Sequence, residues 1–394
     1  MQTAIKCCGQ EHHRNAIKDH VTNGIYILNN CQFFLLRVLW FNWRDIKHPD
    51  AGGAEVLTHE VMRRLIKKGY DMTLFVAQIP SGLKNENIDG INIIRRGGTY
   101  TVYNKAKEHY NKYKSCYDFI VDEINGKPFL TPKFVKQKPI LALFHQMVCE
   151  EWFYEVHFPI NYILYYYLER RWLSYYRNIP IATVSNSSKE DLERIGTKKI
   201  FIVPEGLNVT PLSKVEQKEL EPTVVFIGRL KKHKLPHHAI EAFSIIKREI
   251  PTARMWIIGD GYMFKELKKT NINNVIFYGR VKNELKYELL SKAHLVLVPS
   301  VREGWGLVVI ESNAMGTPVV AYNVPGLRDS VRDQETGVLV KENSPIGLAS
   351  AAISLLKDTT WLSKLSSNAL AFSRKFSWDN TANEFDKIIK DIIS

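Results

Sequence analysis

The sequence lacks several short motifs that are typical of common enzyme classes. No Asp-x-Asp occurs in its 394 residues, and no group of His, Asp and Glu has the spacing of metal ligands. Neither a P-loop nor a Gly-x-Ser-x-Gly motif is present. These absences argue against a metal-bridged diphosphate, a phosphoryl transferase and a serine hydrolase. We expect neither a metal ion nor another cofactor.

Cysteine is scarce, and long hydrophobic runs are missing. The five cysteines are odd in number and form no C-x-x-C pair, which disfavours a zinc site or a disulfide framework and fits a reducing cytoplasm. The most apolar early window, residues 25–41, contains several polar residues and no small-residue cleavage site. We therefore expect a cytoplasmic protein without a transmembrane helix or a secretory signal.

Acidic residues are fewer than basic ones. Lys and Arg number 54 against 41 Asp and Glu, which gives a net charge of +13. Such an excess favours an anionic partner: a nucleotide, a nucleic acid or an anionic lipid. Because zinc-finger and aromatic RNA-binding signatures are absent, we expect no nucleic-acid partner.

Short apolar runs alternate with helical patterns along the chain, which predicts an α/β fold with parallel sheets covered by helices on both faces. The length of the chain and a polar stretch after residues 203–206 indicate two doubly wound, Rossmann-like domains, at 37–204 and 205–375. We expect the two domains to face each other across a cleft. Residues 1–36 match no recognisable element. The expected strands are Arg37–Phe41, Met72–Ala77, Ile91–Arg95, Phe119–Val121, Ile140–Phe144, Ile181–Val184, Thr223–Ile227, Arg254–Ile258, Val275–Tyr278, Leu295–Val298 and Pro318–Ala321.

The most informative segment places two carboxylates eight positions apart, at Glu303 and Glu311. Gly304 and Gly306 lie between them, so a tight turn can bring the backbone close to a ligand. The apolar run that follows can begin a helix whose N-terminus favours an anion such as a pyrophosphate. Carboxylates can accept hydrogen bonds from sugar hydroxyls. The segment therefore predicts a site for a ligand that is both phosphorylated and hydroxylated.

Four further segments follow expected strands and carry candidate site residues. Gly52 and Gly53 open a helix and could admit a phosphate or a sugar, although a plain strand-to-helix turn is equally consistent. Arg229 and Lys234 follow another strand and suit a diphosphate, with a solvated basic loop as the alternative. His145 ends a strand as a hydrogen-bond partner or proton carrier, or as a structural histidine. Asp122 and Glu123 also end a strand and, with Asn125, could bind hydroxyls.

Residues 153–177 combine many aromatic side chains with three arginines, Arg170, Arg171 and Arg177. A basic aromatic helix can lie at a membrane interface. It can equally pack inside a domain, and we slightly favour packing because Glu150, Glu151 and nearby acids dilute the positive charge.

Taken together, these motifs resemble the retaining glycosyltransferases of family 4, which have the two-domain GT-B fold of the glycogen-synthase-like superfamily. The resemblance runs from about residue 37 to the end, and residues 376–394 resemble the family's last helix, which returns to the first domain. Glu205 and Leu235 depart from the asparagine and glycine often found there. The matching elements are Asp50–Glu55, Asp122–Asn125, Phe144–Gln146, Thr183–Ser187, Gly228–Leu230 with Lys234, Gly259–Gly261, Glu303 with Glu311, and Gly316–Val320.

The resemblance implies a role for each matching residue. Arg229 and Lys234 would hold the donor diphosphate, Glu311 the ribose and Glu303 the transferred sugar, while His145 would face the reacting sugar. The first domain would face the acceptor and the second would bind the nucleotide sugar. Catalysis would be metal-independent, with front-face attack and retention of configuration. Further donor contacts are expected from Gly52, Gly53, Gly304, Trp305, Gly306, Leu307 and Val281.

The expected activity is transfer of a hexosyl unit from a UDP- or GDP-sugar to a sugar or a lipid-linked acceptor. A nucleotide-sugar 2-epimerase of the same fold is an alternative, although the glycine-rich context of Glu303 and Glu311 argues against it. A basic membrane-binding module is another. An anionic membrane surface is a candidate partner in either case, which would place the protein peripherally on the inner face of the membrane.

Overall fold

The computed structural model describes residues 35–80, 82–270 and 272–394. Nearly all of the predicted N-terminal extension, residues 1–36, therefore lies outside the described residues. The chain divides into two compact units. The first holds the described residues up to Glu123 with Phe129–Ala142 and Asp391–Ser394, and the second holds Ile124–Pro128 and Leu143–Lys390. The predicted domain boundary at residue 204 falls inside the second unit.

The first sheet has eight strands in the order β3-β4-β2-β1-β5-β6-β7-β8. Its β1–β2, β1–β5, β2–β4 and β7–β8 pairs are parallel, and β3 runs antiparallel to β4. Val38–Phe41 are fully buried, as expected for a parallel strand covered on both faces. The strands are β1 (Leu36–Phe41), β2 (Tyr70–Val76), β3 (Asn85–Ile88), β4 (Ile91–Arg95), β5 (Phe119–Ile124), β6 (Ile140–Phe144), β7 (Ile181–Thr183) and β8 (Ile200–Ile202).

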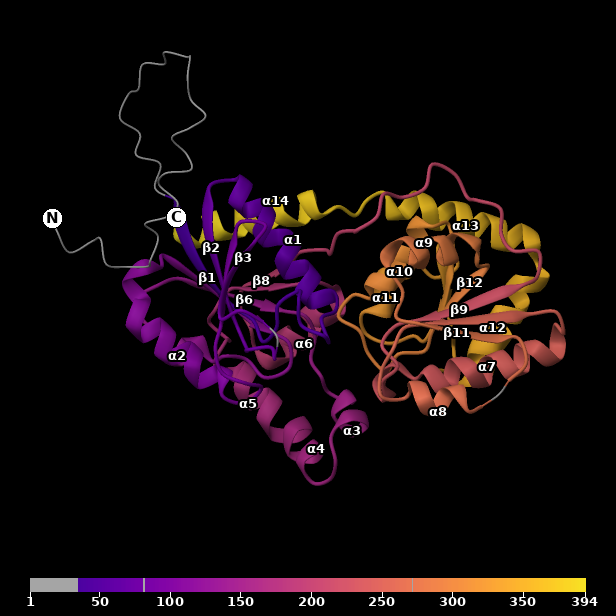
Figure 1. The fold of residues 1–394 in the computed structure, drawn as a ribbon, viewed down its shortest axis with the longest axis horizontal. Helices are drawn as coiled ribbons and strands as arrows, with labels where there is room; N and C mark the ends of the chain where they lie inside the picture. The colour runs from indigo at the N-terminus through magenta and orange to yellow at the C-terminus, as the bar shows by residue number, and fades with distance from the viewer. Residues whose placement is uncertain (1–34, 81, 271) are drawn as a thin grey trace, which may run out of the picture. The chain divides into compact units, whose positions relative to one another are not determined.

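The second sheet lies wholly within the second unit and is parallel throughout, in the order β11-β10-β9-β12-β13-β14. The strand order reverses between β9 and β12, which is the topological switch point where doubly wound sheets bind ligands. Helices α7, α8 and α12 lie along one face, and α9, α10 and α13 lie along the other (Figure 1). The strands are β9 (Thr223–Ile227), β10 (Arg254–Ile258), β11 (Val275–Gly279), β12 (Leu295–Val298), β13 (Val319–Ala321) and β14 (Gly337–Leu339).

The helices follow the strands in the alternation that the sequence predicts. Their bounds are α1 (Gly53–Lys67), α2 (Val102–Tyr113), α3 (Glu151–Glu155), α4 (Ile160–Ile163), α5 (Glu169–Ser174), α6 (Asn186–Ile195), α7 (Pro236–Glu249), α8 (Phe264–Lys268), α9 (Asn283–Lys292), α10 (Leu307–Ala314), α11 (Leu327–Ser330), α12 (Pro345–Lys357), α13 (Thr359–Ser373) and α14 (Trp378–Ile393). A π-helical stretch, Leu164–Leu168, joins α4 to α5. None of the helices within the described ranges is long and apolar enough to span a bilayer.

The α/β class with two sheets of largely parallel strands is confirmed. Strands β4, β6, β9, β10 and β12 have the predicted bounds, because each is an apolar run of four or five residues between clear turn signals. The strands that the sequence did not predict are β3, β8 and β14. They lie at or next to sheet edges, and β3 reads Asn-Glu-Asn-Ile, so edge pairing rather than an apolar pattern defines it.

Candidate functional site

Two loops meet at the switch point of the second sheet. The loop after β9 carries Arg229 and a single 3-10 turn, Lys232–Lys234, and the loop after β12 carries Glu303. Because β9 and β12 are parallel neighbours, both loops leave the sheet at the same edge. The Lys234 Nζ lies 2.5 Å from the Glu303 Oε1. The structure thus brings together two residues that are 69 positions apart in the sequence.

Glu303 is held as a carboxylate within this edge. Its side chain is 14% exposed, and the Ser300 hydroxyl donates to the same Oε1 at 2.7 Å. Burial alone would raise the pKa of Glu303, but the Lys234 ammonium and the Ser300 hydroxyl outweigh it, and the pKa falls below its ordinary value. The site therefore presents an ionised carboxylate that can accept hydrogen bonds from hydroxyl groups.

Arg229 lies two residues beyond β9 and has no partner among the described residues. Its side chain is half-buried, and no residue in the described part of the chain forms a hydrogen bond or an ion pair with its guanidinium. A guanidinium offers five donors in a planar fork, which suits a phosphate. The side chain is therefore available to an anion at the edge where Lys234 also lies.

The glycines after β10 have a packing role that the sequence did not reveal. A Cβ on Gly259 would lie 1.9 Å from the Gly228 carbonyl oxygen, and one on Gly261 would lie 2.4 Å from that of Leu230. The two loops therefore touch backbone to backbone around Arg229. This contact fixes the loop that carries Arg229, so these glycines position the site indirectly.

The turn after Glu303 leads into α10 as the sequence predicted. Gly306 has a φ of +92°, a conformation that favours glycine, and it precedes the helix directly. A Cβ on Gly304 would lie 3.0 Å from the His145 carbonyl oxygen, so this glycine allows a close backbone approach. Trp305 is buried against Phe376, at 5.6 Å between ring centres, and Leu307 is the first residue of α10. The helix N-terminus follows the carboxylate of Glu303 and adds a favourable field for an anion.

Glu311 lies on α10 and is engaged by α9. Its Oε1 accepts from Lys286 Nζ at 2.8 Å and from Tyr287 OH at 3.0 Å. Burial and the Glu311 charge raise the pKa of Tyr287, so the phenol stays a donor. Val281 lies in the link between β11 and α9. The structure therefore places Glu311 against α9, the helix that follows Val281, but one of its oxygens already has two partners.

His145 follows β6 directly and is buried. Its carbonyl oxygen accepts from the Ser188 hydroxyl at 2.8 Å, and its backbone N–H donates to the Ile124 carbonyl at 3.4 Å. These bonds, with the Gly304 contact, fix the backbone on which the imidazole is carried. The backbone of His145 therefore lies next to Gly304, the neighbour of Glu303. The role of the His145 imidazole in a reaction stays a prediction.

Two buried carboxyl groups near these residues were missed by the sequence reasoning. Burial raises the pKa of Glu205 to about 7, with the nearby Glu303 and Glu311 charges adding to the rise and His145 opposing it. Burial likewise raises the pKa of Glu151 to about 8, against the effect of Lys234. Glu151 accepts from Gln146 Nε2 at 2.7 Å. The only signal in the sequence was the position of both acids next to predicted motifs.

Helix α3 positions the Lys234 loop. The Glu155 carboxylate accepts from the backbone N–H of His233 at 3.2 Å and lies 2.7 Å from its Nδ1. The Tyr262 hydroxyl donates to the same carboxylate at 2.9 Å. These contacts lower the pKa of Glu155 to about 2 against the effect of its own burial. They hold the turn that ends at Lys234.

Gly52 and Gly53 belong to the first unit. Gly52 precedes α1, its N–H donates to Glu55 Oε2 at 2.6 Å, and Gly53 is the first residue of the helix. A Cβ on Gly52 would make only an ordinary 3.7 Å contact, and its φ of −143° needs no glycine. Packing within the chain therefore does not explain Gly52, in contrast to Gly259 and Gly261.

The interpretation of Asp122 and Glu123 as hydroxyl-binding residues is wrong, because both are buried and have internal partners. Asp122 accepts from the N–H groups of Phe129 and Thr131 and from the Thr131 hydroxyl. Glu123 accepts from the Trp40 indole at 2.8 Å and from the Thr58 hydroxyl. They organise the loop after β5 and the packing of α1.

The favoured packing of residues 153–177 is also wrong for many of their side chains. Phe158 is 77% exposed and Tyr167 is 73% exposed. These rings contact one another rather than a hydrophobic core. For example, the ring centres of Phe153 and Tyr165 lie 4.9 Å apart. We call this exposed set the aromatic surface; it comprises Phe153, Tyr154, Phe158, Ile160, Tyr162, Ile163, Tyr166 and Tyr167.

Within the described ranges, no group of three or more His, Cys, Asp or Glu side chains could hold a metal ion. The expected independence of metal stays a prediction. The cations at the switch point, Arg229 and Lys234, and the N-terminus of α10 can stabilise negative charge by themselves.

The family-model match falls on the second sheet and its flanking helices. Residues 210–372 match the family model of glycosyl transferases group 1. This range contains Arg229, Lys234, Glu303 and Glu311, so the match covers the switch-point edge. It supports the predicted glycosyltransferase class at the level of this family.

Curated relatives agree with the family match. The D-inositol 3-phosphate glycosyltransferase of Nocardia farcinica is 31% identical over 225 residues, 51% of this chain and 50% of that protein. The poly(glycerol-phosphate) alpha-glucosyltransferase of Bacillus subtilis is 35% identical over 161 residues, 40% of this chain and 24% of that protein. The chain thus spans about half the length, or less, of these two relatives.

Solved structures agree with the fold. The sucrose-phosphate synthase of Thermosynechococcus elongatus superposes with a TM-score of 0.73 at 21% identity, covering 91% of this chain and 99% of that one. HepE of Anabaena, in complex with UDP and glucose, gives a TM-score of 0.69 at 16% identity, covering 90% and 100%. The predicted GT-B architecture, with two Rossmann-like sheets, is therefore confirmed.

Proposed function

We propose that this protein is a retaining glycosyltransferase that transfers a hexosyl unit from a nucleotide diphosphate sugar to a sugar or lipid-linked acceptor. One observation carries the proposal. At the switch point of the second sheet, the loops after β9 and β12 place two features at one edge: the Lys234–Glu303 pair, and Arg229, which has no ion-pair partner in the described ranges. This edge combines cations for a diphosphate with a carboxylate for sugar hydroxyls.

The proposed mechanism needs no protein nucleophile and no metal. Arg229, Lys234 and the N-terminus of α10 stabilise the charge that develops on the departing diphosphate. Glu303 orients the transferred sugar through its hydroxyls, and Glu311 binds the ribose. The acceptor hydroxyl attacks from the face that the diphosphate leaves, and its proton passes to the departing phosphate oxygen, so the anomeric configuration is kept.

The names of the similar proteins support a nucleotide donor and a phosphate-containing acceptor. The HepE structure holds UDP and glucose, and both curated relatives act on acceptors whose names include a phosphate. We therefore favour UDP over GDP as the nucleotide. A nucleotide-sugar 2-epimerase is not favoured, because the matched family model and the named relatives are glycosyltransferases.

Arg229→Ala is expected to abolish the binding of nucleoside diphosphates, because its guanidinium is the one unpaired cation that we assign to the pyrophosphate. Thermal shift with UDP, GDP and their hexose derivatives measures this. Arg254→Ala is the matched control, since Arg254 is exposed at the opposite end of the neighbouring strand β10. Equal stabilisation of the wild type and Arg229→Ala by the same nucleotide would remove Arg229 from the site.

We also propose that the aromatic surface contacts an anionic membrane. Tyrosine and phenylalanine side chains are favoured at the membrane interface, and Arg170 and Arg171 follow them directly on the same helical segment. A membrane contact at this surface would suit a lipid-linked acceptor.

Phe158→Ser combined with Tyr167→Ser is expected to reduce sedimentation with phosphatidylglycerol vesicles by more than half, since both rings are largely exposed. Sedimentation at low and high salt measures it, and the wild-type bound fraction should fall as salt rises. Tyr100→Ser is the control, because Tyr100 is 88% exposed but lies outside the aromatic surface. Unchanged binding of the double variant would exclude this surface as the membrane contact.

A further inference from the structure

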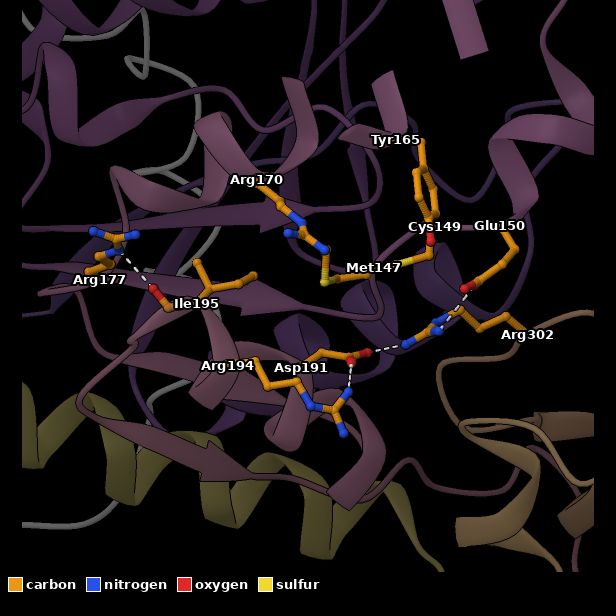
Figure 2. A pocket seen from close by; sticks show the side chains of 10 residues that line it. All are labelled: Met147, Cys149, Glu150, Tyr165, Arg170, Arg177, Asp191, Arg194, Ile195 and Arg302. Carbon is orange, nitrogen blue, oxygen red and sulfur yellow. Dashed lines mark hydrogen bonds and ion pairs between the residues drawn. The ribbon is translucent and has the colours of Figure 1, made fainter. Parts of the chain in front are cut away.

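A cavity of about 410 Å³ lies in the second unit, and arginine side chains dominate its lining (Figure 2). They come from three places in the chain: the helical segment around α5, helix α6 and the loop after β12. Only two acids line it with them. These charged lining residues are Arg170, Arg177, Arg194, Arg302, Glu150 and Asp191.

Both acids form ion pairs with arginines of the lining, namely Arg194 and Arg302. Asp191 is ion-paired with Arg302 and, at 3.0 Å, with Arg194. Glu150 lies 3.5 Å from the Arg302 guanidinium. Burial raises the pKa of the Cys149 thiol to about 12, although Arg302 opposes this, so the thiol adds no negative charge. The remaining arginines of the lining are therefore not neutralised from within.

Arg170 and Arg177 are those remaining arginines. Among the described residues, neither has an acidic partner, and only the Nε of Arg177 is used, in a bond to the Ile195 carbonyl at 2.7 Å. The Nε of the buried Arg302 also lacks a hydrogen-bond partner within the described part of the chain. The cavity thus has donors and positive charge in excess of what the protein itself satisfies.

The wall that carries Arg170 is held in place by its neighbour Glu169. The Glu169 carboxylate is buried and accepts from the N–H groups of Val148 and Cys149 and from the Trp152 indole, at 2.5, 3.0 and 3.2 Å. It ties the loop after His145 to the start of α5. The backbone that carries Arg170 is therefore fixed, while the side chains of Arg170 and Arg177 are themselves exposed.

The cavity adjoins the candidate site without sharing its cations. Arg302 directly precedes Glu303, and Gly304 packs against the carbonyl of His145, where a Cβ would be 3.0 Å away. Arg229 and Lys234 are not part of the lining. A molecule in the cavity would therefore lie beside the residues assigned to the transferred sugar and not on those assigned to the donor diphosphate.

We propose that this cavity binds a phosphate group of the acceptor, with Arg170 and Arg177 as its main donors and Arg302 completing the pocket. Guanidinium groups bind phosphate oxygens through paired, charge-assisted hydrogen bonds. The proposal rests on the glycosyltransferase function proposed above and names the chemical class of its acceptor. The phosphate can belong to a soluble polyol phosphate or to a phospholipid headgroup.

The test compares glycerol 3-phosphate with glycerol by ligand-observed NMR on the full chain, with UDP present in excess to fill the donor site. Glycerol 3-phosphate should bind and glycerol should not. The double variant Arg170→Gln, Arg177→Gln should weaken binding by about tenfold or more, while Arg248→Gln, at an exposed position on α7 outside the lining, should not. Competition by phosphatidylglycerol vesicles, absent with phosphatidylcholine, would identify a lipid-borne phosphate; no competition would identify a soluble one.

The binding of UDP and GDP is measured on the same samples. Loss of nucleotide binding would count against the proposed donor site, whereas loss of glycerol 3-phosphate binding alone would count against the cavity. Circular dichroism and the melting temperature confirm that the double variant is folded. Unchanged glycerol 3-phosphate binding in the double variant would overturn the proposal. So would equal binding of glycerol, or binding of glycerol 3-phosphate that is seen without UDP and lost when UDP is added, which would place it on Arg229 and Lys234 instead.

Discussion

Lys234→Ala is expected to lower the rate of sugar transfer by about 10²–10³-fold, the loss typical of removing one charge-stabilising donor from a site. Two effects act together. The departing diphosphate loses a cation, and Glu303 loses the ammonium that lies 2.5 Å away. Without Lys234, burial raises the pKa of Glu303, so the carboxylate that orients the sugar is less ionised. Release of nucleoside diphosphate from the donor measures the effect.

Lys232→Ala is the matched control for this variant. Lys232 is in the same 3-10 turn but is exposed, with no side-chain ion pair in the described part of the chain. It should keep near wild-type activity. An equal loss in both variants would point to a general change in the loop, and full activity of Lys234→Ala would remove Lys234 from the mechanism.

Glu303→Gln is expected to abolish turnover while leaving the affinity for UDP unchanged. The amide keeps the size of the side chain and an oxygen that can accept from Ser300, but it loses the negative charge that pairs with Lys234. Glu303 is assigned to the sugar and not to the nucleotide. The variant should therefore change the binding and turnover of the nucleotide sugar but not the binding of UDP. Titration calorimetry with UDP, together with a turnover assay, separates the two effects.

Glu311→Gln gives the complementary result. With Glu311 assigned to the ribose, this variant should bind UDP and the UDP-sugar more weakly by a similar factor. Glu335→Gln, at an exposed position, is the control and should change neither. A loss of UDP affinity in Glu303→Gln, or unchanged UDP affinity in Glu311→Gln, would contradict the assignment of the two carboxylates.

The alternation of apolar runs and helical patterns predicted most of the fold. Thr223–Ile227 and Leu295–Val298 were found with their bounds, and these two strands define the switch point. Once the strands are known, the loop residues that follow them, such as Arg229 and Glu303, can be placed at one edge. The central part of the candidate site was therefore accessible from the sequence.

What the sequence did not reveal depends on contacts between distant segments. Asp122 and Glu123 resemble ligand-binding acids, but buried donors from Thr131, Trp40 and neighbouring residues occupy them. Local patterns also could not show that residues 153–177 expose their rings, because exposure depends on what the rest of the chain covers. The arginine-lined cavity is formed by residues as far apart as 147 and 302 and has no sequence motif.

The measurement that tests the central claim most directly is release of nucleoside diphosphate by the full chain from a panel of UDP- and GDP-hexoses, without added metal. We expect turnover of at least one UDP-hexose, accelerated by an acceptor that carries a phosphate and a hydroxyl group, and lost in Lys234→Ala. If no member of the panel is turned over or stabilises the protein against heat, or if Lys234→Ala is as active as the wild type, the proposed site is wrong.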